Sequence, residues 1–420
     1  MKTTDAFTRG QYLIDTILLK MGQIKKWQGE FVSKIILLSL SMGGRFNFMQ
    51  MGREGDYNEQ TYRNNFEKPF DFLKFNTELV KHHTSKHVIL VFDPSYITKS
   101  GKQTPNLGYF YSGKASRYKK GLEIGGIAAV DLNQNTAYHL EAIQSPAANK
   151  ESVNDHYTLV DHYADLIIKR ASELEQISNI LVVDGYFPKY KFIEPIKRRT
   201  NLTVISRLRD DANLKYIYNG VKSKGRGRPK KYSGKVNTKK IDKRVFRKEY
   251  EDTDMIIYGA IVYSVSMKRK IKVAYVEFLD DSNKVSFTKI FFSTDIDMDA
   301  TIIVKYYKSR FQIEYLYRDS KQFTGLEHCQ ARSENKLYFH FNTSLTAVSI
   351  GKILLRDGLD KSLPMSLSIS DIKTEFRNRN MIFRIFSMYG FDQTLIKINP
   401  DDTFEHKIYR ALLNFGKIAA

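Results

Sequence analysis

Apolar residues recur at helical spacing in the first part of the chain. The pattern holds over 13–18 and over 31–40, is interrupted at Gly43-Gly44, and returns over 59–66. Residues 1–80 are therefore predicted to form a helical N-terminal domain. Helices around a glycine-containing turn are also a weak cue for a helix-turn-helix, so DNA contact by this domain and a plain helical bundle stay equally open.

Beyond residue 80 the pattern changes to short apolar runs typical of strands. Strands are predicted over 87–92, 122–132, 136–143, 179–183 and 202–206, and helices over 156–174 and 190–196. The first strand is expected to end at Asp93-Pro94, because proline lacks the N–H that a sheet ladder uses. Strands that are apolar throughout indicate a sheet covered on both faces. The expected fold class is α/β, a mixed sheet flanked by helices.

A second β-rich segment interrupts this order before the helical pattern returns at Ala300. Its strands are expected over 255–265, 272–279 and 286–293. These changes of pattern predict a helical domain over 1–80, a core over 81–206 and 296–345, a basic, β-rich insertion subdomain over 207–295, and a helical C-terminal region over 346–420.

The charge of the chain points to a polyanionic partner. Its 420 residues carry 67 Lys and Arg against 46 Asp and Glu, a net charge of +21. Thirteen of the cations, with Asp242 as the one acid, lie within 222–248, so the charge is concentrated. Nucleic acid fits this balance better than a membrane, since no apolar run reaches the ~18 residues that a membrane span needs. The single cysteine, Cys329, excludes an intramolecular disulfide and indicates a reducing, intracellular setting.

Two aspartates follow apolar strands. Asp93 comes after Leu-Val-Phe and Asp184 after Leu-Val-Val. Strand ends in α/β sheets hold reactive groups at fixed positions, and paired carboxylates suit a hard divalent cation. Either aspartate alone could equally be the cap of an Asp-Pro or Asp-Gly turn.

A third acid belongs to the helix expected after Ala300. Four of its residues lie at i, i+3, i+7 and i+14, and so on one face of one helix: Tyr307, Arg310, Glu314 and Lys321. An acid flanked by cations suits a face that holds a metal and phosphates, although Arg310–Glu314 could be an ordinary i,i+4 ion pair.

This Tyr-x2-Arg-x3-Glu-x6-Lys spacing resembles the signature of the hairpin-forming, cut-and-paste DDE transposases of bacterial insertion sequences. The resemblance extends over roughly 85–345: both aspartates precede the signature, and the β-rich interruption falls between Asp184 and Glu314, where this family carries one. One departure is Phe311, where relatives usually have Trp.

The resemblance implies an RNase H-like catalytic core in which Asp93, Asp184 and Glu314 bind two magnesium or manganese ions. Asp93 would bridge the two ions, and Tyr307, Arg310 and Lys321 would hold phosphates of the element end. It further implies excision and strand transfer through a DNA hairpin, double-stranded DNA (terminal inverted repeats and target) as the partner, a homodimer on DNA, and a bacterial cytoplasmic, nucleoid-associated location.

A second motif lies inside the basic window. Residues 225–231 match an AT-hook pattern, in which Arg226, Arg228, Lys230 and Lys231 surround a Gly-Arg-Pro core. Glycine lets the backbone follow a narrow minor groove while the cations approach its negative potential. A flexible basic loop that contacts phosphates without specificity is the other interpretation.

Two further functions remain open. An RNase H-like DNA nuclease or resolvase would cut without strand transfer, and an inactive DNA-binding repressor would bind without cutting.

Overall fold

The structure is a computed structural model, and it describes residues 5–147, 157–220, 229–358, 368–390, 409 and 411–416. Its N-terminal part is helical, as predicted, with α1 (Ala6–Lys20), α2 (Lys26–Ser41), α3 (Phe48–Glu54), α4 (Glu59–Asn65) and α5 (Phe72–His83). Four of these helices begin at an Asp or Asn whose side chain accepts a backbone N–H: Asp5, Asn47, Asn58 and Asp71. None of the described helices is long and apolar enough to cross a membrane.

The core sheet follows these helices. Its strands are β1 (Val88–Thr98), β2 (Gly108–Ser112), β3 (Arg117–Asp131), β4 (Thr136–Gln144), β5 (Ile180–Val183) and β6 (Thr203–Leu208). They lie in the order β2-β3-β1-β5-β6, with β4 paired to β3. β1, β5 and β6 are parallel to one another, and β3 is antiparallel to β1. The fold is therefore mixed α/β.

The prediction that the first strand ends at Asp93-Pro94 is wrong. β1 continues to Thr98, and Pro94 pairs with Gly125 of β3. Among the described strands, β5 accompanies β1 only from Leu90 to Phe92. Beyond Phe92, β1 is therefore bonded on one side only, and proline is tolerated where its missing N–H faces no ladder.

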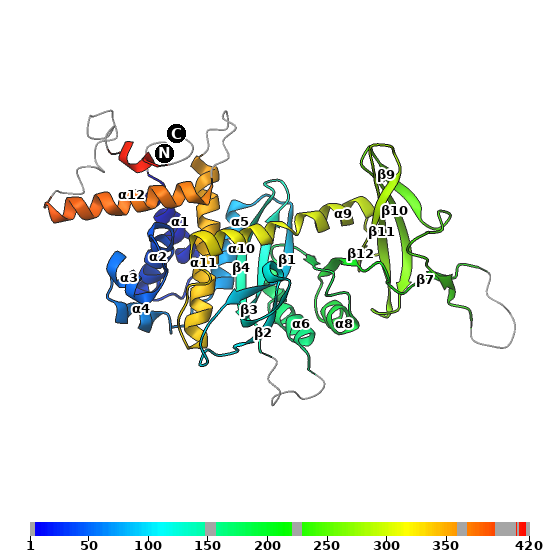
Figure 1. The fold of residues 1–420 in the computed structure, drawn as a ribbon, viewed down its shortest axis with the longest axis horizontal. Helices are drawn as coiled ribbons and strands as arrows, with labels where there is room; N and C mark the ends of the chain where they lie inside the picture. Colours follow the sequence, from blue (N-terminus) through cyan, green and yellow to red (C-terminus); the bar gives the residue numbers. More distant parts are fainter. Residues whose placement is uncertain are drawn as a thin grey trace.

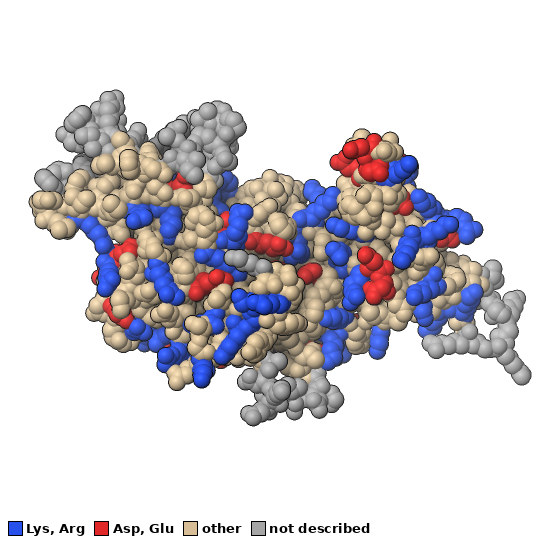
Figure 2. All heavy atoms as spheres, viewed as in Figure 1, with Lys and Arg blue, Asp and Glu red and all other residues tan. Residues whose placement is uncertain are grey.

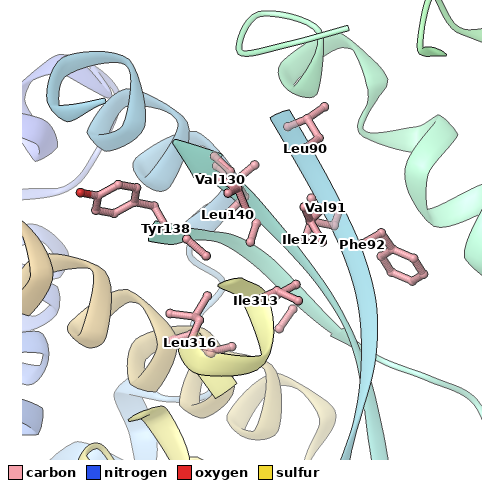
Figure 3. Packing of buried hydrophobic residues seen from close by; sticks show 14 of the residues in the cluster. Leu90, Val91, Phe92, Ile127, Val130, Tyr138, Leu140, Ile313 and Leu316 are labelled. Carbon is pink, nitrogen blue, oxygen red and sulfur yellow. The ribbon is translucent and has the colours of Figure 1, made fainter. Parts of the chain in front are cut away.

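Helices cover both faces of this sheet. The first face is covered by α6 (Leu159–Lys169), where the ring of Tyr163 lies 5.3 Å from that of Phe92. The helix expected over 156–174 ends earlier, since α7 (Ala171–Leu174) is separate from α6, and α8 (Tyr190–Arg199) packs beside α6. Figure 3 shows Ile313 and Leu316 of α10 (Gln312–Phe323) on the other face, while Phe92 points away from them.

The basic insertion adds six strands to the same sheet. They are β7 (Leu214–Ile217), β8 (Tyr232–Lys235), β9 (Arg247–Glu251), β10 (Met255–Ser264), β11 (Arg269–Leu279) and β12 (Val285–Ser293). The last three match the predicted strands; the short β7, β8 and β9 were not expected. β12 pairs with β6 from Ile290↔Leu208 to Ser293↔Ile205, so the described strands form one 12-stranded, mostly antiparallel sheet.

Two consecutive helices connect the insertion with the core. Figure 1 shows α9 (Ala300–Ser309) beside β12 and, almost in line with it, α10 against the core sheet. One helix was expected here, but Arg310 and Phe311 separate the two. The separation is one turn of tighter i→i+3 bonds, in which Arg310 N–H donates to Tyr307 and Glu314 N–H to Phe311. The chain continues in α11 (Glu334–Gly358) and α12 (Ile369–Met388), as the helical pattern predicted.

Close packing around Gly126 gives a test of this arrangement. A Cβ on Gly126 would lie 2.0 Å from the hydroxyl of Tyr317, which is buried between α10 and β3. We expect Gly126→Ala to lower the free energy of unfolding by about 1–3 kcal/mol, because an overpacked core must shift. Urea denaturation measures the loss. Gly113→Ala is the control, since nothing lies within 4 Å of its Cβ; equal stability of the two variants would contradict the packing.

Candidate active site

Asp93 lies where β1 leaves its parallel neighbour. Its side chain is 16% exposed, and its backbone carbonyl accepts a 2.6 Å hydrogen bond from the Tyr317 hydroxyl. Tyr317 belongs to α10, so this bond fixes the strand against the helix that carries Glu314. The pattern of apolar residues did not indicate Tyr317; the only signal was its place one turn after Glu314.

Asp184 lies beside Asp93 across the parallel pair. Phe92 and Val183 are register partners, so Asp93 and Asp184 are the next residues along the two parallel strands. The Asp184 side chain is exposed, and its backbone carbonyl accepts a 2.8 Å bond from the Ser206 hydroxyl of β6. The prediction that each aspartate lies at the end of a strand holds for Asp184, which follows β5, and is wrong for Asp93, which lies inside β1.

Arg310 bridges two of the three predicted acids. Its Nη1 lies 3.1 Å from Asp93 Oδ1, and its Nη2 lies 2.9 Å from Glu314 Oε1. The side chain is 13% exposed, and Glu314, in the first turn of α10, is 40% exposed. The i,i+4 ion pair weighed from the sequence is present, but the same guanidinium also reaches a carboxylate 217 residues away.

The pKa of Asp93 is raised. Burial raises it to about 7; Arg310 opposes the shift, and the charges of Asp184 and Glu314 add to it. The arginine therefore does not offset the cost of burying this carboxylate.

The other two signature residues flank the centre. The pKa of Tyr307 is raised, mainly by burial; the Arg310 charge opposes this and the Asp184 charge adds to it. The Arg310 guanidinium lies 5.8 Å from the centre of the Tyr307 ring. Lys321 Nζ donates to the Tyr96 carbonyl at 2.8 Å and pairs with Glu327 at 3.4 Å. Tyr307 thus lies beside Arg310, and Lys321 contacts β1 beyond Asp93.

The basic loop is only partly described. Arg226 and Arg228 lie outside the described residues. Lys230 and Lys231 are exposed, and Lys230 Nζ lies 5.1 Å from the centre of the Tyr218 ring. These two lysines lie in the insertion, between β7 and β8.

The donor set can be tested against a divalent cation. Three carboxylates offer the oxygen ligands that hard cations prefer, and a cation would stabilise the charged form of Asp93, whose pKa is raised mainly by burial. No group of three or more His, Cys, Asp or Glu in the described residues is gathered closely enough to hold a metal ion. Arg310 takes the place between Asp93 and Glu314. The chemistry fits a cation, provided that Arg310 releases these acids.

Fold and site together define a mixed α/β protein with a carboxylate centre at a sheet edge. The family model of the transposase DDE domain matches residues 84–350, more than half of the chain. The chain belongs to this DDE transposase family, whose members bind DNA, cleave or transfer its strands and generally use divalent metal ions. No curated protein matches the chain.

The raised pKa of Asp93 predicts a pH dependence of stability. Between its ordinary value of 3.8 and about 7, the folded chain keeps a proton that the unfolded chain has lost. The free energy of unfolding therefore falls as the pH rises through this interval. We expect Asp93→Asn to remove this part of the loss, on the order of a few kcal/mol, because one pKa unit corresponds to about 1.4 kcal/mol.

Urea unfolding in EDTA at both ends of the interval measures the effect. The asparagine oxygen can still accept from Arg310, so the variant removes the charge and keeps the shape. A variant that loses as much stability as the wild type over this interval would show that Asp93 is not the titrating group.

Proposed function

We propose that this chain is the transposase of a bacterial insertion sequence, which excises the element and transfers its ends to target DNA with the help of divalent cations. The observation that carries the proposal is the meeting of Asp93, Glu314 and Arg310 at the edge where Asp184 also emerges. In a chain of this family, these are the groups that phosphoryl transfer requires.

In this proposal Asp93, Asp184 and Glu314 hold magnesium or manganese, with two ions as the expected number. A bound cation supplies Lewis-acid polarisation of the DNA phosphate and acidifies water. The chain's part is to place the carboxylates: Tyr317 fixes Asp93, the first turn of α10 presents Glu314, and Ser206 fixes the carbonyl of Asp184.

Arg310 has the features of a phosphate ligand. Among the described residues, its Nε is a buried donor with no hydrogen-bond partner, and such donors are rare in folded proteins. Its planar guanidinium can pair with phosphate oxygens in a bidentate manner. We propose that Arg310, with Tyr307 and Lys321 beside it, turns from the carboxylates to the element end.

The surface charge supports contact with DNA over an extended part of the protein. Figure 2 shows Lys and Arg side chains over much of the visible face, with an acidic group at the outer end of β9 and β10. We propose double-stranded terminal repeats and target DNA as partners, pairing of two ends by a homodimer, and a hairpin intermediate. The RNase H-like character of the core and the domain bounds given above belong to the same proposal.

Cleavage of an element-end duplex tests the proposal. We expect wild type to cut only with magnesium or manganese, and Glu314→Gln, Asp93→Asn and Asp184→Asn each to cut at least about 100-fold more slowly, because an amide cannot replace a charged ligand. DNA binding in EDTA should persist in all three.

Asp281→Asn, on the exposed turn between β11 and β12, is the matched control and should cut normally. A variant that cuts at the wild-type rate would remove its residue from the triad. Cutting without joined products would favour the nuclease, and binding without cutting by wild type would favour the repressor.

The basic loop predicts a measurable salt effect. If Lys230 and Lys231 each neutralise one phosphate, changing both to Gln should make the slope of log K against log salt shallower by about 2, since each contact contributes about 0.9. Fluorescence anisotropy over a range of salt concentrations measures the slope. An unchanged slope would place the loop away from DNA.

A further inference from the structure

The segment between Asp93 and Glu123 combines positive charge with exposed tyrosines. It contains no Asp or Glu and six Lys or Arg. Most of it folds into the hairpin of β2 and β3, which lies at one end of the strand order of the described sheet. This hairpin is separate in sequence from the signature residues of α9 and α10 and from the basic loop over 222–248.

Three tyrosines lie on one face of the hairpin. Tyr111 is paired with Tyr118, and Tyr109 with Lys120; residues paired or two apart on a strand share a face. Tyr109, Tyr111 and Tyr118 are 73%, 54% and 70% exposed, and the rings of Tyr111 and Tyr118 are 5.8 Å apart.

The opposite face anchors the hairpin. Phe110 is 5% exposed, and the Cβ of Gly108 would lie 2.7 Å from Ala147. The Tyr96 hydroxyl of β1 donates to the Lys120 carbonyl at 2.7 Å. The exposed aromatic rings are therefore carried by a fixed strand pair and not by a free loop.

The hairpin is hydrogen-bonded to β1, the strand that carries Asp93. Lys321 donates to the carbonyl of Tyr96, whose hydroxyl holds the hairpin. Tyr186, two residues after Asp184, is 50% exposed, and Lys189 Nζ lies 3.3 Å from the centre of its ring. Tyr186 and Lys189 thus add an aromatic and a cationic group near Asp184 in the chain.

We propose that the exposed face of the β2–β3 hairpin binds the bases of an unpaired DNA strand. Tyrosine rings can stack on any unpaired base, whereas the faces of duplex bases are covered by the neighbouring base pairs. The exposed Lys120, which is paired with Tyr109 on the same face, complements a phosphate of that strand. The inference rests on the proposed function for DNA as the polymer, but it requires neither cleavage nor a cation.

Binding of the full-length chain in EDTA tests this inference separately from catalysis. The probes are a fluorescein-labelled oligothymidylate and a duplex of equal length, followed by anisotropy. We expect Tyr118→Ala and Tyr111→Ala each to raise the Kd of the single strand about tenfold, the loss of one stacked base, and to leave the duplex Kd nearly unchanged. Tyr118→Phe keeps the ring and should bind like the wild type.

Tyr250→Ala is the matched control. Tyr250 is an exposed tyrosine on β9, where Glu251, Asp252 and Asp254 follow it, so DNA should not approach. An unchanged single-strand Kd in both alanine variants would overturn the proposal, as would equal losses on single strand and duplex. A wild-type dimer in gel filtration that Tyr118→Ala dissociates, with unchanged single-strand binding, would assign the face to a second copy of this chain. Thermal melting of each variant identifies losses of binding that are caused by unfolding. If an alanine variant is unfolded, the Tyr118→Phe variant serves as the test, and weaker single-strand binding by it would contradict stacking on the ring.

Discussion

The guanidinium of Arg310 pairs a carboxylate of β1 with a carboxylate of α10, beside the hydrogen bonds by which Tyr317 and Lys321 also join α10 to β1. It lies at the turn between α9, which packs on the insertion strands, and α10, which packs on the core sheet. From that turn it reaches Asp93 and Glu314 together. A buried carboxylate is costly unless paired, so removing this cation would leave Asp93 uncompensated. This bridge and the Tyr317–Asp93 hydrogen bond together hold α10 and β1, and therefore the acids, in place.

The bridge can form because β1 is longer than the parallel pairing beside it. β5 accompanies β1 only to Phe92, so Asp93 emerges where the ladder opens, while β3 supports the strand onward to Thr98. Pro94 suits this stretch, which is bonded on one side. The same extension places Tyr96 between Lys321 and the β2–β3 hairpin. One change in strand pairing thus positions the acidic centre and its cationic surroundings.

The sequence predicted what depends on local pattern. Apolar runs identified β5 and the strands β10–β12, and the spacing of Arg310 and Glu314 identified their ion pair. It did not predict the continuation of β1 through Pro94, because that depends on the end of the β5 pairing at Phe92, which leaves the proline with no strand on one side. β2 and β7 to β9 are short and partly polar, so their pairing comes from adjacent strands and not from their own pattern. The contacts of Asp93 with Arg310 and Tyr317 join residues more than 200 positions apart, which no local spacing encodes.

The charges of the centre also connect its two expected ligands. Asp93 and Glu314 share Arg310, and the pKa of Asp93 is about 7 because burial outweighs the effect of this arginine. Under the proposed function, a cation at the carboxylates frees the guanidinium, and a phosphate at the guanidinium frees the carboxylates. Binding of the cation therefore raises the affinity for the phosphate, and binding of the phosphate raises the affinity for the cation. Linkage makes the two factors equal. Such an arrangement keeps a strongly acidic centre compatible with a polyanionic substrate, since neither charge need be buried without its partner.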